Sequence, residues 1–395
     1  MNKGEIMMRQ KMLWAAAILG LAACGRNPTG PMADGKHADQ PSLSRDDNGV
    51  STRNLAAGAV YTLSNNATTN AVIAYSRASD GQLTPAGTYP TGGRGTGGGL
   101  GSQGAVVISA DGQRLFAVNA GSNDITEFLI TNSGLVRTAI VPSGGIRPIS
   151  LSVNKDLLYV LNAGGTGNVT AFRSEGNGGL YPIANSTRPL SSNASGPAQV
   201  GITPNGQALV VTEKATNIIT TYLIGRSGLA SGPIVNVSSG QTPFGFTFDK
   251  KGLLIVSEAF GGAPGASAAS TYVVYPDGKL HLKTASLLTG QTAACWFAVS
   301  DNGKFAYSTN TGSADLSAFG IRDEALSLVA GSGNAGSTNA TPVDVTFSVN
   351  SQYLYVLTGS GFINAFSADA STGALTSVGA GVSGLPAGTV GLAAR

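Results

Sequence analysis

The sequence predicts an all-β fold, a seven-bladed β-propeller with four-stranded antiparallel blades. The first reason is composition: 56 Gly and only 11% charged residues in 395 favour short strands and tight turns over long salt-bridged helices. The second is a repeated pattern, which recurs seven times after residue 57. The third is a strand-like segment at the C-terminus that has no place in the last repeat.

Each repeat contains an apolar strand, a polar turn, a second strand, a Gly-containing turn, a third strand that ends on an aromatic, and a fourth strand. AVVISADGQRLFAVNAGSNDITEFLITNSGL from Ala105 and SLSVNKDLLYVLNAGGTGNVTAFRSEGNGGL from Ser150 show the same pattern. One marker residue closes each second strand: Asn66, Asn119, Asn162, Glu213, Glu258, Asn310 and Thr358. The markers are about 49 residues apart, within the range of four-stranded blades.

The two ends of the repeat region are expected to complete one blade together. The first repeat begins at AVYTLSNN, its second strand, whereas Pro386 to Ala394 (PAGTVGLAA) has the length of a missing first strand. Pairing of this C-terminal strand with the N-terminal blade would close the ring and remove exposed sheet edges. Residues 58–395 are therefore predicted to form one propeller.

The N-terminal region has the features of an export signal. Lys3, Arg9 and Lys11 precede the apolar run from Met12 to Leu21. Ten residues of helix rise about 15 Å, half of a bilayer core, so the run fits a signal peptide (1–23) rather than a membrane span. Residues 24–57, rich in Pro, Gly, Ser and Asp, are predicted to be a flexible tether.

Charge and histidine content exclude several function classes. The net charge of +3 comes from 24 basic and 21 acidic residues scattered without a basic block, so nucleic-acid binding is not expected. Two His leave little material for metal sites or catalytic triads, and we expect no cofactor and no metal. The segment 93–99 (GRGTGGG) lacks the Lys-Ser/Thr of a P-loop, which favours a flexible connection between blades.

One rim of the channel is expected to collect the polar candidates. The first strand of a blade runs along the channel and the second returns beside it, so first-strand starts and second-strand ends share a rim. The predicted first-strand starts are Gly104, Arg147, Ala198, Phe244, Cys295, Val343 and Ala387.

Two interpretations of this rim remain open. Glu213 and Glu258 could approach each other as an acid/base pair, or hold a hard cation, while Arg147 could stabilise an oxyanion. Alternatively, the Asn and Glu markers only end strands before Gly-containing turns and bond the local backbone.

The motifs SADGQRLFAVNAG, TPNGQALVVTE, SDNGKFAYSTN and SVNSQYLYVLTG resemble those of lactonase-type seven-bladed β-propellers. That family includes bacterial 6-phosphogluconolactonase and fungal carboxymuconate-lactonising enzyme, with YVTN-repeat surface proteins as relatives, and the resemblance covers residues 58–395. It implies a rim His, then an Arg-His pair in the next blade and a Glu ending that blade's second strand. Here Ala198 and Phe244-Gly245 stand at the His and Arg-His positions, and only Glu258 matches.

A second resemblance concerns the export signal. Leu21-Ala22-Ala23-Cys24 resembles a bacterial lipobox, which implies acylation of Cys24. Gly25 follows where an Asp would imply retention at the inner membrane, so an outer-membrane anchor facing the periplasm is expected.

The predicted function is therefore a cell-envelope lipoprotein whose propeller serves as a ligand- or protein-binding or scaffolding module. The expected partner is a polar small molecule or an envelope protein, with contact to the membrane through the lipid anchor only and a monomeric chain. The predicted ligand-binding residues are Asn66, Asn119, Asn162, Asn310 and Thr358. The alternative is an enzyme, a lactone hydrolase or muconate cyclase, in which Glu258, Glu213 and Arg147 carry an altered mechanism; an adhesion-type propeller is a third possibility.

Overall fold

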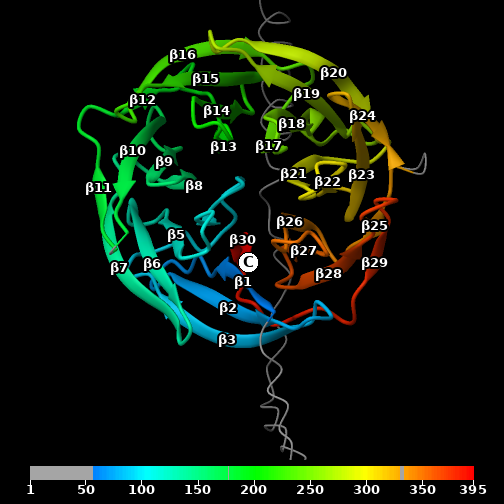
Figure 1. Cartoon of the computed structure of the whole chain (residues 1–395), viewed down its shortest axis with the longest axis horizontal. Helices are drawn as coiled ribbons and strands as arrows, with labels where there is room; N and C mark the ends of the chain where they lie inside the picture. The colour runs from blue at the N-terminus through cyan, green and yellow to red at the C-terminus, as the bar shows by residue number, and fades with distance from the viewer. Residues whose placement is uncertain (1–56, 177, 330–332) are drawn as a thin grey trace, which may run out of the picture.

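Each repeat folds into one antiparallel sheet, and seven such sheets surround a central channel (Figure 1). The structure, a computed structural model, describes residues 57–176, 178–329 and 333–395. The predicted signal peptide 1–23 and all but the last residue of the predicted tether lie outside the described residues. The prediction of a seven-bladed propeller is confirmed.

The strands of blades 1 to 4 are given from the channel outward. Blade 1 contains β30 (Val390–Ala394), β1 (Gly58–Leu63), β2 (Ala71–Arg77) and β3 (Leu83–Pro90). Blade 2 contains β4 (Val106–Ile108), β5 (Arg114–Asn119), β6 (Asp124–Thr131) and β7 (Gly134–Pro142). Blade 3 contains β8 (Pro148–Asn154), β9 (Leu157–Asn162), β10 (Asn168–Ser174), β11 (Leu180–Pro182) and the short β12 (Arg188–Pro189). Blade 4 contains β13 (Pro197–Ile202), β14 (Ala208–Glu213), β15 (Ile218–Ile224) and β16 (Ala230–Val237).

Blades 5 to 7 complete the ring in the same order. Blade 5 contains β17 (Pro243–Phe248), β18 (Leu253–Glu258), β19 (Ala268–Val274) and β20 (Leu280–Leu288). Blade 6 contains β21 (Ala294–Val299), β22 (Phe305–Asn310), β23 (Asp315–Arg322), β24 (Ala325–Leu328) and the short β25 (Gly336–Ser337). Blade 7 contains β26 (Pro342–Phe347), β27 (Tyr353–Thr358), β28 (Ile363–Ala368) and β29 (Leu375–Ser377).

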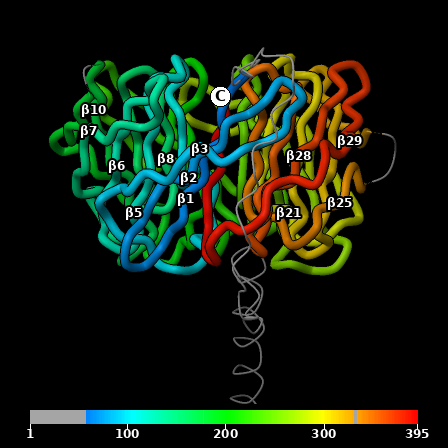
Figure 2. Tube along the Cα trace, turned by 90° about the horizontal axis from the view of Figure 1, so that it is seen from below, coloured from blue at the N-terminus to red at the C-terminus, as the bar shows by residue number. Residues whose placement is uncertain are grey.

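The C-terminal strand closes the ring, as the sequence predicted. Strand β30 pairs antiparallel with β1, with Thr62 opposite Leu392, and Figure 2 shows the red C-terminal strand beside the blue N-terminal strand. The Thr62 hydroxyl also donates to the carbonyl oxygen of Gly391 at 2.7 Å. All the strands and all the apolar core clusters of the described residues lie between 58 and 395, so this segment contains all seven sheets of the ring.

The second strand of each blade forms the core. It lies between the first and third strands and between the neighbouring blades. Strands β14 and β18 are therefore buried at every residue, and each begins with four consecutive apolar residues. Tyrosines in these strands link one blade to the next. The hydroxyls of Tyr159, Tyr307 and Tyr355 donate to Gly carbonyls in the following blade at 2.7, 2.9 and 2.9 Å.

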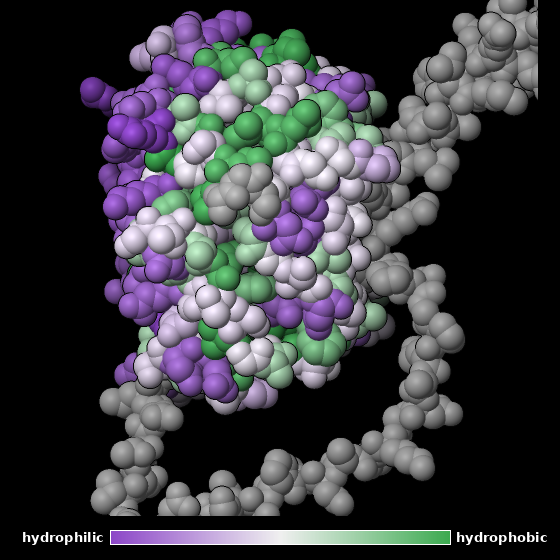
Figure 3. Space-filling model, turned by 90° about the vertical axis from the view of Figure 1, so that its right-hand side faces the viewer, coloured by the Kyte–Doolittle hydropathy of each residue, from purple (hydrophilic) through white to green (hydrophobic). Residues whose placement is uncertain are grey.

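The two faces of the ring differ in charge. We call the face formed by the first-to-second and third-to-fourth strand turns the charged face, because it carries ion pairs such as Lys250–Asp301 at 2.6 Å. In Figure 3 these hydrophilic residues gather along the left edge of the ring. The opposite face holds the other loops, which consist mainly of Gly, Ser, Thr, Asn and Ala. We call it the plugged face, because residues 100–104 cross the channel there.

A buried carboxyl group lies at the closing junction. Asp344 of β26 is 1% exposed, and its Oδ1 accepts a hydrogen bond from the Val345 N–H at 2.8 Å, while its Oδ2 has no partner among the described residues. Burial raises the pKa of Asp344 well above 3.8, against the hydrogen bond from the Val345 backbone and the smaller opposing effect of the Leu392 backbone in β30. The native state therefore favours the protonated carboxyl.

Replacement Asp344→Asn is expected to stabilise the protein at neutral pH. Because the native pKa is raised, the unfolded state loses its proton first, and stability falls as pH rises above about 4 toward the native pKa. Asn carries no charge to bury, so we expect a gain on the order of 1–3 kcal/mol at pH 7, measured by thermal and denaturant unfolding. The gain should shrink near pH 4.

Asp369→Asn in the same blade is the matched control. Asp369 is exposed, and backbone hydrogen bonds from Thr372 and Ser371 lower its pKa, so its replacement should slightly reduce stability at pH 7. Equal effects of the two replacements would contradict the role given to burial.

Candidate functional site

The strand register places first-strand starts and second-strand ends on one face, as predicted. Pro197 pairs with Glu213, Pro243 with Glu258, and the first strands of blades 3, 6 and 7 pair in the same way with Asn162, Asn310 and Thr358. This is the plugged face. The side chains at these positions nevertheless point between blades, because side chains of a strand alternate between the two faces of its sheet, and these sheet faces meet neighbouring blades.

Glu213 binds the connection that enters its blade. It is fully buried and accepts hydrogen bonds from the Ser191 N–H at 3.0 Å, from the Ser191 hydroxyl, and from the Thr220 hydroxyl at 2.6 Å. Residue 191 lies between blades 3 and 4, and Thr220 lies on β15. The carboxylate thus joins two strands and a loop.

Glu258 has the same position in blade 5. It is also fully buried, and it accepts hydrogen bonds from the Gly240 N–H at 2.8 Å and the hydroxyls of Ser270 and Ser286 at 2.5 and 2.6 Å. Burial raises the pKa of Glu258, against these three hydrogen bonds. The two glutamates bind different blade junctions and share no hydrogen-bond partner.

Three Asn markers repeat this arrangement. Asn119 Nδ2 donates to the Thr126 hydroxyl at 2.8 Å and its Oδ1 accepts from the Thr91 hydroxyl at 2.7 Å. The corresponding amide of Asn162 bonds to the Ser143 carbonyl oxygen at 3.1 Å. That of Asn310 bonds to the Ser317 hydroxyl at 2.8 Å. All three are fully buried, so their amides connect strands and loops within the ring.

The remaining two markers belong to turns. Thr358 is 1% exposed, and its hydroxyl lies 3.1 Å from that of Ser360. Asn66 is exposed and accepts from the Thr68 N–H at 2.8 Å. In blade 1 the position equivalent to the other markers is Ser64, which lies opposite Ala71 of the next strand. Asn66 lies two residues further on, because the turn of this blade is longer.

The predicted cation Arg147 lies at the surface of the plugged face. It is exposed, has a left-handed backbone with φ 56°, and its N–H donates to Asn123 Oδ1 at 2.7 Å. Its neighbour Lys214, which directly follows the marker Glu213, was not among the predicted site residues. Lys214 Nζ donates to the Gly101 carbonyl oxygen at 2.6 Å and lies 4.6 Å from the Phe244 ring centroid.

Lys214 is a titratable group without a described carboxylate partner. Burial, and then the charge of Arg147, lower its pKa to about 7. Glu213, adjacent in sequence, points away into its blade junction. A Lys just beyond a second-strand end was the sequence signal that could have identified it.

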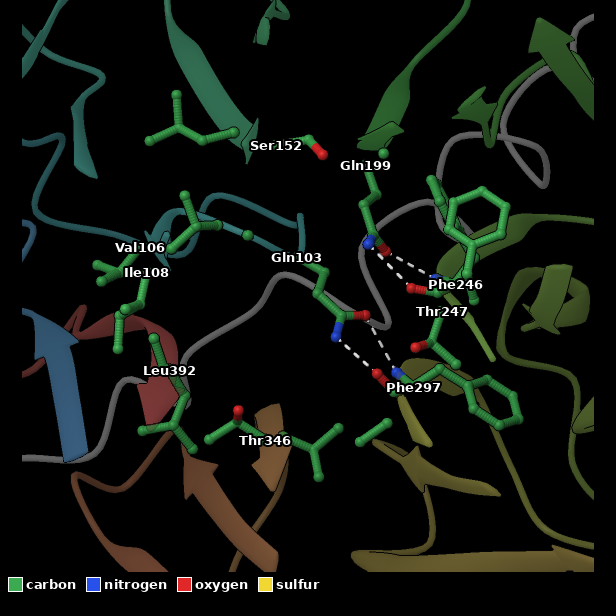
Figure 4. A pocket seen from close by; sticks show the side chains of 18 of the residues that line it. Gln103, Val106, Ile108, Ser152, Gln199, Phe246, Thr247, Phe297, Thr346 and Leu392 are labelled. Carbon is green, nitrogen blue, oxygen red and sulfur yellow. Dashed lines mark hydrogen bonds between the residues drawn. The ribbon is translucent and has the colours of Figure 1, made fainter. Parts of the chain in front are cut away.

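Residues 100–104, which we call the plug, cross the channel on this face. The Ser102 hydroxyl donates to the Ile149 carbonyl oxygen of blade 3 at 2.8 Å. The Trp296 indole N–H of blade 6 donates to the Ser102 carbonyl oxygen at 2.8 Å. The Gln103 amide exchanges two hydrogen bonds with the Phe297 backbone at 2.8 and 3.0 Å (Figure 4). One segment therefore bonds to opposite sides of the ring and closes one end of the channel.

The Gly-rich segment before the plug is held tightly. It connects blades 1 and 2, as predicted. Its backbone hydrogen bonds, however, disagree with the flexibility that was predicted for this segment. Gly95 N–H donates to the Asn66 carbonyl oxygen and Gly97 N–H to that of Asn65, both at 2.7 Å. A Cβ on Gly95 would lie 2.2 Å from the Asn65 backbone. Close backbone approach explains the glycine there.

The two positions that the family resemblance assigns to His and Arg-His are closed. Ala198 is fully buried, and Phe244, 1% exposed, packs edge-to-face on Trp296 with centroids 5.1 Å apart. A Cβ on Gly245 would lie 2.5 Å from Gln103 Oε1 and 2.4 Å from the Cys295 carbonyl oxygen. The plug thus occupies the space that a histidine side chain would need.

Beyond the plug the channel is a cavity of about 460 Å³ that opens on the charged face. All seven first strands line it, and Gln103 lies at its closed end (Figure 4). Val, Ile, Leu and Phe are frequent among its lining residues, but many of these side chains are buried between the blades, and the surface that faces the cavity is more polar than apolar. None of the lining residues is Asp, Glu, Lys, Arg or His.

Metal ligands do not gather in the described part of the chain. Within residues 57–176, 178–329 and 333–395, no three His, Cys, Asp or Glu residues form a group that could hold a metal ion. Cys295 is buried, and its Sγ lies 3.2 Å from the Ala293 carbonyl oxygen.

The tight contact at Gly95 can be tested by Gly95→Ala. The new methyl group would clash with the Asn65 backbone, so we expect a loss of about 1–3 kcal/mol in the free energy of unfolding, measured by denaturant titration. Gly98→Ala is the control, because a Cβ there meets nothing within 4 Å. Equal stability of the two variants would show that the segment moves freely.

Comparisons with known proteins agree with the ring. Residues 59–188 match the family model "Lactonase, 7-bladed beta-propeller", and no curated protein matches the sequence. A Bacteroides uniformis protein provisionally named a 6-phosphogluconolactonase superposes with a TM-score of 0.68 at 18% identity, over 84% of this chain and 98% of its own. Its Bacteroides fragilis counterpart gives 0.66 at 18% identity, over 88% and 99%.

The periplasmic gluconolactonase of Pseudomonas aeruginosa has a TM-score of 0.67 at 18% identity, over 84% of this chain and 98% of its own. Likeness at such identities shows the fold alone. The family match covers residues 59–188, and the seven-bladed ring observed here is the fold that the description of the matched family names.

Proposed function

We propose that this protein is a cell-envelope lipoprotein whose propeller binds a ligand or partner without hydrolysing lactones. The observation that carries the proposal is the closed position at Gly245, where Gln103 of the plug lies 2.5 Å from the place of a Cβ. In the resemblance this position belongs to a histidine. No imidazole fits there while the plug is in place.

The remaining family residue is poorly placed for catalysis. Lactone hydrolysis requires a base that contacts water and a cation near the developing oxyanion. Glu258 is fully buried, and three hydrogen-bond donors of blades 4 and 5 hold its carboxylate. Because the Glu258 carboxylate is buried and cannot contact bulk water, its position supports a binding role for the propeller rather than lactone hydrolysis.

The envelope location rests on the N-terminal sequence. The apolar run before Cys24 fits an exported lipoprotein, with Cys24 acylated and the ring tethered at the outer membrane facing the periplasm. Within the described residues no helix is long and apolar enough to cross a membrane. A periplasmic gluconolactonase among the structural neighbours supports an exported propeller.

A lactonase is the second candidate. The names of the structural neighbours favour it, and Lys214 and Arg147 provide cations at the plugged face. In that mechanism Lys214, with a pKa of about 7, would be a base near neutral pH, and Arg147 would stabilise the oxyanion. Glu258 and Glu213 would act only if the blade junctions opened.

The two candidates differ in turnover. Purified residues 58–395 are expected to hydrolyse sugar lactones and muconolactones no faster than buffer, measured by pH-stat titration and by loss of the lactone carbonyl absorbance. Saturable hydrolysis that Glu258→Gln or Lys214→Met abolishes without changing the melting temperature would overturn the proposal and establish the enzyme. The buffer-level rate should be the same for the parent and both variants.

The anchor has its own test. Cells that express the full chain are expected to incorporate labelled palmitate into it, and Cys24→Ala should remove the label because the acylated thiol is gone. Cys295→Ala, which changes the other cysteine, should retain it. Label that persists in Cys24→Ala would rule out lipidation at this residue.

A further inference from the structure

We propose that the blind central channel binds an uncharged small molecule that enters from the charged face. The inference deepens the proposed function and rests on it, since it treats the ring as a binding module. The site is distinct from the plugged face, where the family resemblance puts its catalytic residues.

The channel has the size and shape of a small-molecule site. Its cavity of about 460 Å³ lies within the 300–1,000 Å³ typical of ligand pockets. Seven rigid inner strands form the wall, so the site exists before a ligand arrives. Preformed walls reduce the entropy lost on binding.

The closed end of the channel is firmly built. Two hydrogen bonds join the Gln103 amide to Phe297, and the Ser150 hydroxyl donates to the Gln103 carbonyl oxygen at 2.6 Å. The amide of Gln199 is joined to the Phe246 backbone in the same way, at 2.9 and 2.7 Å (Figure 4). Because these amides are already paired, a ligand that reaches the closed end meets satisfied polar groups.

The chemistry of the wall selects against charge. The side chains of Val106, Leu392 and Phe297 are buried beside the cavity, and no ionisable side chain lines it. A charged ligand would lose its hydration without gaining a counterion, which is unfavourable. The hydroxyls of Thr247 and Thr346 face the channel (Figure 4), so a ligand can carry one or two hydrogen-bonding groups.

The mouth of the channel is apolar although the face around it is charged. Its ring consists of partly exposed residues at the ends of the first strands: Ile108, Val153, Phe248, Val299 and Phe347. Apolar surface left open to water within a charged face marks a binding position. Burying this surface under an apolar part of a ligand would favour binding.

The test uses two dyes that differ mainly in charge, with residues 58–395. N-phenyl-1-naphthylamine is neutral, and 8-anilino-1-naphthalenesulfonate carries a sulfonate. We expect saturable one-to-one binding of the neutral dye, followed by its fluorescence increase and by calorimetry. Binding of the sulfonate at this site should be at least about tenfold weaker.

Two variants fill the channel from different blades. Thr346→Trp and Thr247→Trp should each weaken binding of the neutral dye by at least about tenfold, because the indole occupies the cavity. The control is Thr376→Trp, the same change on the exposed outer strand β29, which should leave binding unchanged. If one channel variant fails to fold, as judged by circular dichroism, the other retains the test.

Three results would overturn the inference: no saturable binding of the neutral dye, binding unaffected by both channel variants, or sulfonate binding that is equally tight and equally sensitive to them. Each of these leaves the lactone assay untouched. Lactone turnover with intact dye binding would instead contradict the proposed function alone.

Discussion

Pairing of β30 with β1 is the interaction on which the rest of the structure depends. It makes one blade from the first and the last strand of the described residues and covers the inner edge of β1. Only a closed ring brings the seven first strands around one channel. The buried carboxyl of Asp344 beside this junction shows that closure is maintained despite a group that prefers to be neutral.

The plug gives the closed ring two unlike ends. Residues 100–104 bond to blades 3, 4 and 6 and separate the plugged face from the cavity. On one side lie Lys214, Arg147 and a face poor in charge. On the other lies an uncharged channel inside a charged face. The seven-bladed ring can therefore keep its architecture while Gln103 of the plug fills the space beside Gly245.

The markers illustrate what a repeat pattern can and cannot predict. It correctly located six of the seven second-strand ends, including Glu213 and Glu258, and the face on which they lie. Their side-chain direction was not predictable from the pattern, because the same spacing serves a channel-facing or a blade-facing residue. At Asn66 the longer turn moved the motif away from the strand end, and the register identified Ser64 instead.

By itself the sequence determined the number of blades, the order of strands and the closing role of the C-terminal segment. These follow from local periodicity and turn residues, which are written along the chain. The plug, the closed position at Gly245 and the blind channel were decided only by the tertiary structure. They depend on contacts such as Gln103 with Phe297, 194 residues apart, and no local pattern encodes which distant backbone groups a side chain will meet.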